Sequence, residues 1–321
     1  MNDLDRLKRS ISETYDLEVK HIELIYNAIN KILRITSNND TLILKLFKKN
    51  DYSNYKISFE RKVMLHIFSH QINIIEPIPP ASHQEQIYQF ENQFYFGILT
   101  RECSGDLYFT KNNTQTHNYL FGQILFKLHN SPPPSLRNPK YDTTNSEHLI
   151  LKLEKSNHSW QAFQLKQIID TLYTNIKETT QSHTESVRKC ICHGDAWPGN
   201  ALYFSKTCTL IDFEHTRISD PAFDIATFIW WLSGSEYKES EKFKAWECFT
   251  RGYGDSINQL LNRKLSTLIK INQLRSLVFL HNNIISSDEI LEHARHQTLD
   301  LLKKLTQPLN NKQQLETLWK K

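Results

Sequence analysis

Glycine is scarce in this chain, which has 8 glycines among 321 residues and none in residues 1–96. Glycine-rich loops grip phosphate groups because glycine takes positive φ freely and lets a ligand approach the backbone closely. The N-terminal region therefore contains no glycine-rich phosphate loop. Its nearest substitute is the segment 26–30 (YNAIN), because asparagine tolerates positive φ better than most residues. We interpret this segment either as a plain hairpin turn or as a turn that contacts phosphate.

Long apolar runs are also missing. No stretch approaches the ~20 apolar residues of a membrane span, and residues 1–20 mix charges throughout, without the apolar core of a signal peptide. We therefore expect a chain that is neither exported nor bound to a membrane.

Cysteine is sparse and odd in number: Cys103, Cys190, Cys192, Cys208 and Cys248. The Cys-x-Cys pair at 190–192 lacks a second pair to complete a zinc site, which favours reduced thiols in the cytoplasm.

Charge of one sign is not in large excess. The 39 basic and 35 acidic residues give a formal net charge of +4 and form no long basic run, so nucleic acid is not an expected partner. The composition is 39% hydrophobic and 23% charged, which is typical of a globular enzyme. A length of 321 residues exceeds what one core usually organises and predicts two domains.

The first hundred residues predict a small antiparallel sheet that is interrupted by one helix. Four β-like runs predict strands at 19–29, 31–36, 41–47 and 94–100. Apolar residues close to helical spacing predict a helix over 55–70. The prolines of the segment that follows, 77–80, indicate a connection between this helix and the next strands.

From residue 107 onward the sequence is typical of a mainly helical region. Helices are predicted at 119–129, 159–179, 221–232, 242–253, 265–279 and 290–305. The short apolar runs 190–192 and 209–213 predict strands on either side of a loop, and catalytic loops often occupy such places. We therefore expect an α+β protein, with a nucleotide-binding β-rich lobe at 1–100 and a larger, mostly helical lobe at 101–321 that carries the hinge, the catalytic residues and the substrate site.

The loop 193–200 (HGDAWPGN) carries the strongest chemical pattern. It has an aspartate two residues after a histidine and an asparagine five residues after the aspartate. This spacing is typical of a kinase catalytic loop, in which a carboxylate orients an attacking hydroxyl group and accepts its proton while an amide oxygen ligates Mg²⁺. Asp195 is then the candidate base, and Asn200 is a candidate metal ligand.

A second acid follows twelve residues after the asparagine. Asp212 ends an apolar run in the segment 210–214 (LIDFE), where it could hold the metal that bridges the phosphates of ATP. The segment 220–224 (DPAFD) then leads into a helix. The loop pattern alone could arise by chance, but the loop pattern followed by both Asp212 and the segment 220–224 is much less frequent by chance.

Together these motifs resemble the aminoglycoside phosphotransferase and choline kinase superfamily. The resemblance rests on HGDxxxxN, IDFE and DPxxD, and the segments 121–129 (FGQILFKLH) and 249–254 (FTRGYG) look like two further family elements. It implies a bilobal protein-kinase-like fold that binds ATP and Mg²⁺ and transfers the γ-phosphoryl group to a hydroxyl group of a small molecule. It also implies that His193 braces the loop and that Asp224 accepts backbone hydrogen bonds from it.

The same resemblance assigns nucleotide contacts in the N-terminal lobe. Lys45 is a single lysine in an apolar strand, and a point charge there can pair with phosphates. Glu60 lies on the predicted helix, where it would hold Lys45 in line as the family's Lys–Glu pair does. The segment 97–105 resembles the hinge, with Arg101 and Cys103 as the residues whose backbone groups would contact adenine.

The acceptor is not set by these motifs. Members of the resembling family act on aminoglycosides, choline, ethanolamine, homoserine and sugar derivatives, and their acceptor pocket comes from variable helices. Four acidic residues either receive a cationic acceptor or form a solvated helix face: Glu236, Asp288, Glu289 and Glu292.

Three alternative functions differ in what they explain. A metal-dependent hydrolase would use His193, Asp195, Asp212 and Asp224 as ion ligands, but it gives Lys45 no role. An inactive, nucleotide-binding pseudokinase conflicts with the presence of the base and both metal ligands. A protein kinase is disfavoured because no Asp-Phe-Gly and Ala-Pro-Glu pair bounds an activation segment.

Overall fold

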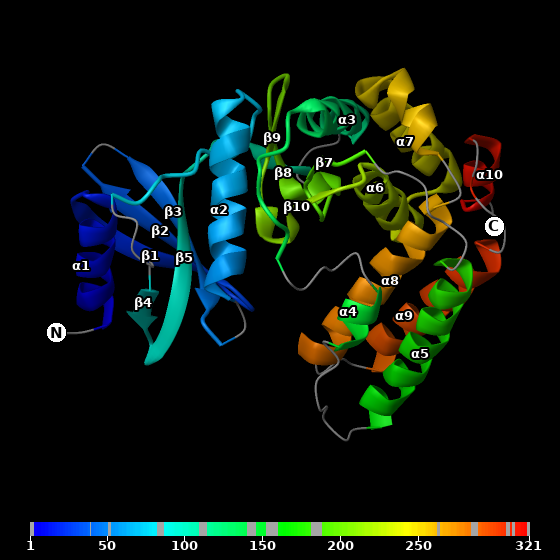
Figure 1. The fold of residues 1–321 in the computed structure, drawn as a ribbon, viewed down its shortest axis with the longest axis horizontal. Coiled ribbons are helices and arrows are strands. Elements are labelled where there is room, and N and C mark those ends of the chain that lie inside the picture. The colour runs from blue at the N-terminus through cyan, green and yellow to red at the C-terminus, as the bar shows by residue number, and fades with distance from the viewer. Residues whose placement is uncertain are drawn as a thin grey trace. The chain divides into compact units, whose positions relative to one another are not determined.

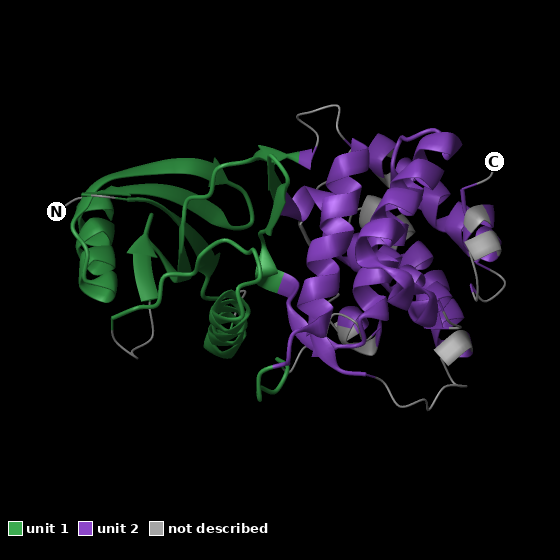
Figure 2. Ribbon diagram, turned by 90° about the horizontal axis from the view of Figure 1, so that it is seen from above, with its two compact units in different colours: residues 1–107, 134–139, 202–214 green, residues 108–133, 140–201, 215–321 purple. Residues whose placement is uncertain are grey.

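The computed structural model (Figure 1) describes residues 3–38, 40–50, 53–81, 87–108, 114–139, 146–151, 160–180, 188–261, 264–283, 288–305, 309 and 312–319. The chain divides into two compact units, coloured green and purple in Figure 2. Unit 1 contains residues 1–107, 134–139 and 202–214, and unit 2 contains 108–133, 140–201 and 215–321. Residues 202–214, which the sequence led us to place in the second lobe, therefore belong to unit 1.

Unit 1 is built on a five-stranded sheet with the strand order β1-β2-β3-β5-β4. The strands are β1 (Val19–Asn27), β2 (Lys31–Ser37), β3 (Thr41–Lys48), β4 (Ile87–Phe90) and β5 (Gln93–Arg101). All neighbouring strands pair antiparallel. The four predicted strands are confirmed to within two residues at each end, and β4 was missed because it has only four residues.

Two helices cover the opposite faces of this sheet, α1 (Asp3–Tyr15) and α2 (Asn54–Ser69) (Figure 1). Successive strand residues point to alternate faces, so Leu42, Leu44 and Leu46 pack into the apolar core beneath α1. The intervening Lys45 consequently points to the face that α2 covers. The predicted helix at 55–70 is confirmed as α2, whereas α1 was not predicted, although its apolar residues recur every three to four positions in a charged segment.

A smaller three-stranded sheet completes unit 1, with β6 (Asp106–Leu107), β8 (Ala201–Phe204) and β9 (Thr207–Leu210). Strand β9 ends at Leu210, before the end of the predicted run 209–213. The backbone of Leu210 explains this end, because its N–H donates to Asn73 and its carbonyl accepts from Ile75. These bonds fix the chain just before residues 212–214 against the segment that follows α2.

Unit 2 is mostly helical. Its helices are α3 (Thr114–Asn130), α4 (Ser146–Leu151), α5 (Trp160–Thr180), α6 (Ala222–Gly234), α7 (Glu239–Tyr253), α8 (Lys264–Asn283), α9 (Asp288–Lys304) and α10 (Lys312–Thr317). A two-stranded antiparallel ladder joins β7 (Cys190–Cys192) to β10 (Arg217–Ser219). The six predicted helices are confirmed, and the described helices include none that is both long enough and apolar enough to cross a membrane.

Helices α3 and α7 approach closely at two glycines that sequence analysis had placed in family-like segments. A Cβ atom at Gly122 would collide with the carbonyl oxygen of Phe249, and one at Gly252 would collide with the carbonyl oxygen of Tyr119. Each helix therefore presents a glycine to the backbone of the other. This reciprocal contact explains why the segments 121–129 and 249–254 occur together, and it places the end of α3 against α7.

We expect Gly122→Ala to destabilise unit 2 by roughly 1–3 kcal/mol, because the added methyl group forces the two helix backbones apart. Gly252→Ala should do the same, and the double variant should lose less than the sum because one separation relieves both clashes. Urea unfolding followed by circular dichroism measures the change. Lys127→Ala, at an exposed position of α3, is the control and should change stability by no more than about 0.5 kcal/mol. A fully additive double variant would contradict this account.

Candidate active site

The loop 193–200 begins where β7 ends and closes with a 3-10 turn, Pro198–Asn200. Gly194 has a φ of 81°, and a Cβ atom there would collide with the carbonyl oxygen of His215. Only glycine meets both conditions without strain. The glycine of the motif thus turns the chain sharply between His193 and Asp195.

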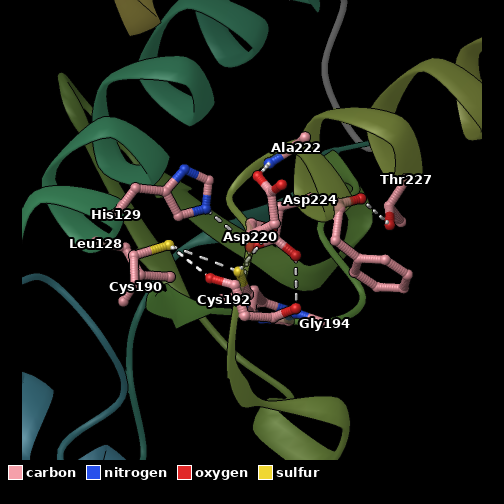
Figure 3. A network of polar contacts seen from close by, with 12 residues as sticks. Leu128, His129, Cys190, Cys192, Gly194, Asp220, Ala222, Asp224 and Thr227 are labelled. Carbon is pink, nitrogen blue, oxygen red and sulfur yellow. Dashed lines mark hydrogen bonds and ion pairs between the residues drawn. The ribbon is translucent and has the colours of Figure 1, made fainter. Parts of the chain in front are cut away.

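Asp224, in the first turn of α6, fixes this turn through its carboxylate (Figure 3). Its carboxylate accepts the backbone N–H of His193 at 2.7 Å and that of Gly194 at 2.9 Å. His129 Nε2, at the end of α3, lies 3.0 Å from the same carboxylate. The buried carboxylate thereby joins the loop, α6 and α3, through the backbone contacts that the sequence led us to expect of it.

The pKa of Asp224 is lowered although its carboxyl group is fully buried. Burial alone would raise the pKa, but the hydrogen bond and charge of His129, the charge of His193 and the Gly194 N–H together outweigh that effect. The ionised carboxylate is therefore the form that the fold stabilises.

Asp195 and Asn200 meet within the loop. The Asn200 side-chain N–H₂ donates to Asp195 Oδ2 at 2.7 Å and to the Asp195 carbonyl at 2.9 Å. Because both bonds use the amide nitrogen, the amide oxygen of Asn200 remains as its acceptor atom. His193 Nδ1 accepts the Asp195 N–H at 3.3 Å, which braces the loop from inside. The Asp195 side chain is 30% exposed, so the loop holds its carboxylate while leaving it accessible.

Arg275 is a neighbour of Asp195 that sequence reasoning missed. Its guanidinium Nη2 lies 3.8 Å from Asp195 Oδ1, and it stacks over the ring of Phe223 at 5.5 Å. The residue comes from the middle of α8, eighty positions beyond Asp195, and nothing in its local sequence marks it. The candidate base therefore has a positive charge beside it.

In unit 1, Lys45 contacts two acids that follow β9. Lys45 Nζ donates to Asp212 Oδ1 at 2.7 Å and to Glu214 Oε2 at 3.1 Å. Asp212 has a φ of 62°, a conformation that aspartate takes more readily than most residues. Glu214 also accepts a hydrogen bond from Asn30 at 2.7 Å. Glu214 belongs to the IDFE motif, but no sequence pattern assigns it a contact with Lys45.

Glu60 does not form the predicted ion pair with Lys45. The side chains of both residues are described, and no salt bridge joins them, because Asp212 and Glu214 occupy the lysine ammonium group. Glu60 is buried on α2, and its Oε2 has no hydrogen-bond partner. Burial is the main cause that raises the pKa of Glu60 to about 8; the charge of Lys45 opposes this shift, and Glu214 adds to it. Glu60 is thus mostly protonated at neutral pH, and its charge acts on Lys45 only when the pH rises above about 8.

Three acids, Asp212, Glu214 and Glu60, surround Lys45. Burial alone would lower the pKa of Lys45, but these three acids together raise it. A further cation, Lys56, lies 3.7 Å from Glu214. Asp212, whose side chain is 43% exposed, presents the most accessible carboxylate of the three. Accessible carboxylate oxygens suit a hard cation such as Mg²⁺.

The hinge prediction is partly changed by the backbone contacts of unit 1. The Arg101 N–H donates to the Glu76 carbonyl at 2.9 Å, and its side chain bonds Glu76 and Asp40. The Arg101 N–H is therefore not available to adenine, because it already bonds Glu76. Of the two predicted backbone contacts to adenine, only that of Cys103 remains. The segment 101–105 lines a hollow of about 460 Å³ together with Asp40 and Thr41.

The segment 26–30 forms a hairpin turn between β1 and β2, closed by the Ala28 N–H, which donates to the Asn30 carbonyl. None of its residues has positive φ.

Among the four acidic acceptor candidates, Glu292 is exposed and bonds Arg295, which agrees with a solvated helix face. The side chain of Asp288 lies outside the described residues. All five cysteines are free thiols, as predicted.

Comparison with known proteins identifies the class to which this fold and loop belong. The sequence profile of the phosphotransferase enzyme family (APH) matches residues 23–252. The chain belongs to this family and is a phosphotransferase. Both the resemblance seen in the motifs and the expected α+β, kinase-like fold are thus confirmed. No curated protein sequence matches the chain.

Solved structures share the fold at low sequence identity. Amicoumacin kinase hAmiN, in complex with AMP-PNP, Ca²⁺ and Ami, is 17% identical with a TM-score of 0.71, and the match covers 93% of this chain and 94% of that chain. Spectinomycin phosphotransferase APH(9)-Ia, in complex with ADP and spectinomycin, is 16% identical with a TM-score of 0.64 over 98% and 97% of the two chains. A microcompartment-associated aminopropanol kinase is 13% identical with a TM-score of 0.66 over 94% and 96%.

We expect Asp224→Asn to destabilise the protein by about 3 kcal/mol, because its amide group cannot accept from every donor that now faces the carboxylate. The lowered pKa of Asp224 means that its contribution to stability is present above about pH 4 and is lost as the pH falls further. Urea unfolding at several pH values tests both points. The free energy of unfolding should fall less steeply below about pH 4 in Asp224→Asn than in the wild type. The control Asp170→Asn, at an exposed position, should keep the wild-type slope. Equal acid slopes for Asp224→Asn and the wild type would refute the assignment.

We expect Glu60→Gln to flatten the loss of stability that occurs as the pH rises from about 4 to about 8. The folded-state pKa of Glu60 is raised to about 8, whereas an unfolded glutamate has a pKa of about 4.3. Between these values the folded chain holds a proton that the unfolded chain has released, so stability falls as the pH rises. Melting temperatures at pH 5 and pH 8 measure the slope. Exposed Glu13→Gln should behave like the wild type, and an unchanged slope in Glu60→Gln would contradict the buried, proton-binding state.

Proposed function

We propose that this phosphotransferase is a cytoplasmic, ATP- and Mg²⁺-dependent kinase that phosphorylates a hydroxyl group of a small molecule. Asp195 is the base, Asn200 and Asp212 each offer an oxygen ligand to Mg²⁺, and Lys45 pairs with the phosphates. Cys103 contacts the adenine base through its backbone. The use of a nucleotide is supported by the relatives described above, which were solved with AMP-PNP or ADP.

The observation that carries this proposal is the arrangement of Asp195 in its loop. A base must present a carboxylate oxygen to an acceptor hydroxyl group in one orientation. Asn200 holds Oδ2 at 2.7 Å, and His193 holds the backbone N–H of Asp195. The carboxylate is therefore oriented before an acceptor arrives, so less of the binding energy is needed to order it.

The contribution of unit 1 is electrostatic. Lys45 is a cation held in place by Asp212 and Glu214, and a phosphate group can replace one of these acids as its partner. When Mg²⁺ is bound, it supplies the charge that neutralises the phosphoryl oxygens. Asp212 would hold the metal ion, and Glu214 would keep Lys45 in position. This division of roles would account for two acids bonding the same lysine.

The charge beside the base bears on the acceptor. Arg275 lies within 3.8 Å of the Asp195 carboxylate, so a cationic group of an acceptor close to the reacting hydroxyl would be repelled. We therefore expect acceptors whose cationic groups lie away from that hydroxyl. Amicoumacin, spectinomycin, aminopropanol, ethanolamine and choline form a suitable panel, because they vary this distance.

The test is formation of ADP from ATP with each acceptor, followed by variants with the acceptor that responds. We expect Asp195→Asn to lower kcat by roughly 10²-fold or more with little change in nucleotide affinity, since the base contacts the acceptor. Lys45→Ala should raise the KM for ATP and lower kcat together. Asp170→Asn and Lys48→Ala, both exposed, are the matched controls.

Three results would oppose this function. Near wild-type kcat in Asp195→Asn would show that another group is the base. Binding of ATP without turnover on any acceptor, and with no effect of the Asp195 variant, would instead indicate an inactive nucleotide-binding protein. Phosphate release that requires a tightly held transition metal and is indifferent to Lys45→Ala would indicate a hydrolase.

A further inference from the structure

A histidine and two cysteines meet in the buried part of unit 2. His129 ends α3, and Cys190 and Cys192 lie on the same side of β7 because residues two apart in a strand share a face. Their potential ligand atoms all lie within 4.8 Å of one another. In Figure 3 the edge of the His129 ring that carries Nε2 is turned toward the two sulfur atoms. The third donor that a Cys-x-Cys pair lacks in the sequence is thus supplied by a distant helix.

The spacing of these atoms suits one metal ion. The two sulfur atoms lie 3.7 Å apart. Two sulfurs bound to one tetrahedral ion at about 2.3 Å would lie about 3.8 Å apart, so the strand already holds them at the required separation. The three side chains are each no more than 1% exposed, which excludes competing water. Two thiolates and an imidazole are soft or borderline donors, and these select Zn²⁺ or Cu⁺ over Mg²⁺.

A disulfide between the same cysteines fits the strand less well. It would need the sulfurs to approach to about 2.05 Å and the Cα atoms to lie within about 6.8 Å. Residues two apart in an extended strand are about 6.6 Å apart, at the upper end of that range. Both thiols are also buried and bonded weakly to carbonyl groups, Cys190 to Ser219 and Cys192 to Asp220. Forming the disulfide would therefore distort β7, whereas binding an ion leaves the strand as it is.

From this geometry we infer that unit 2 binds one thiophilic cation, Zn²⁺ or Cu⁺, through His129 Nε2, Cys190 Sγ and Cys192 Sγ. Each thiol releases its proton to solvent, two metal–sulfur bonds and one metal–nitrogen bond form, and the ion gives up the water that it carried. No electron is transferred. Two thiolates neutralise Zn²⁺, and the neighbouring Asp224 carboxylate adds a favourable negative charge.

The bound ion changes the loop that carries Asp195, a consequence that rests on the proposed function. His129 Nε2 cannot both bind the ion and donate to Asp224, so the 3.0 Å hydrogen bond is lost. The same carboxylate oxygen holds the backbone N–H of His193. The cation therefore loosens or shifts the loop and inhibits phosphoryl transfer. The site is an inhibitory one for thiophilic metals, separate from the Mg²⁺ ligands.

Binding is tested on the full, reduced chain without nucleotide or acceptor. After treatment with a chelator, the protein is dialysed against Zn²⁺ or, without oxygen, against Cu⁺, and the bound metal is counted. We expect one equivalent per chain and a higher melting temperature with the metal bound. Cd²⁺ serves as a probe, because its bonds to thiolates absorb in the ultraviolet.

The cysteine variants identify the ligands. Cys190→Ser and Cys192→Ser should each lower the affinity for the ion at least tenfold and remove most of the Cd²⁺ absorbance. Cys208→Ser and Cys248→Ser replace buried cysteines outside the group and should behave like the wild type. Circular dichroism shows whether each variant is folded. A wild-type chain that binds no stoichiometric ion, or a Cys190→Ser/Cys192→Ser double variant that still binds it, would overturn the site. Loss of two thiols to a disulfide in the metal-free chain would overturn it as well.

Inhibition is measured separately, with saturating Mg²⁺ and an acceptor that gives turnover. Zn²⁺ should lower kcat of the wild type at least tenfold and leave Cys192→Ser nearly unaffected, which distinguishes this site from competition for Mg²⁺. Equal inhibition of both proteins would refute the coupling to the loop. A chain that binds one Zn²⁺ but shows no kinase activity would refute the proposed function and leave the metal site standing.

Discussion

The buried carboxylate of Asp224 is the interaction on which the candidate site in unit 2 depends. It accepts two consecutive backbone N–H groups, from His193 and Gly194, and it lies 3.0 Å from His129. Burying a charge is costly unless hydrogen bonds replace the water that it loses. Here the replacement donors come from two segments far apart in the sequence, the loop after β7 and the end of α3, while α6 carries the carboxylate, so the charge is satisfied only when all three are in place.

That requirement explains several other features of unit 2. The end of α3 must approach α7 closely, and glycines at 122 and 252 permit the approach. Tyr253, at the end of α7, contacts His129 Nδ1 at 2.7 Å and so orients the ring toward Asp224. Gly194 must turn sharply to offer its N–H to the carboxylate. Each of these residues belongs to a motif whose purpose was not visible until the helices were brought together.

The sequence could predict the elements that have a repeating pattern. The β-like runs and the helical spacing located four strands and seven helices, because periodicity is a local property. The loop 193–200 and Asp212 were recognisable because the spacing of their polar residues is fixed by one short segment. The family followed from these motifs, since a few residue types at fixed distances are infrequent by chance.

The contacts that the sequence could not predict are those between distant segments. Arg275 lies on α8 beside Asp195, and no local pattern marks a helix residue as the neighbour of a loop. Lys45 was paired with Glu60 because the family has such a Lys–Glu pair, yet the left-handed conformation of Asp212 brings another acid to the lysine. His129 was missed as a partner of Cys190 and Cys192 for the same reason, because a ligand set drawn from a helix and a strand has no sequence spacing.

Unit 1 holds its cation by a different principle from that of Asp224. The carboxylate of Asp224 has a donor for each oxygen, whereas three acids crowd around Lys45 and Glu60 keeps a buried oxygen without a hydrogen bond. Acids this close oppose one another's ionisation, which contributes to the raised pKa of Glu60, and they gain when positive charge arrives. The first site is therefore complete without a ligand and serves to hold a loop. The site around Lys45 is incomplete without a ligand. A bound cation therefore stabilises the chain most where Asp212 and Glu214 converge on the lysine.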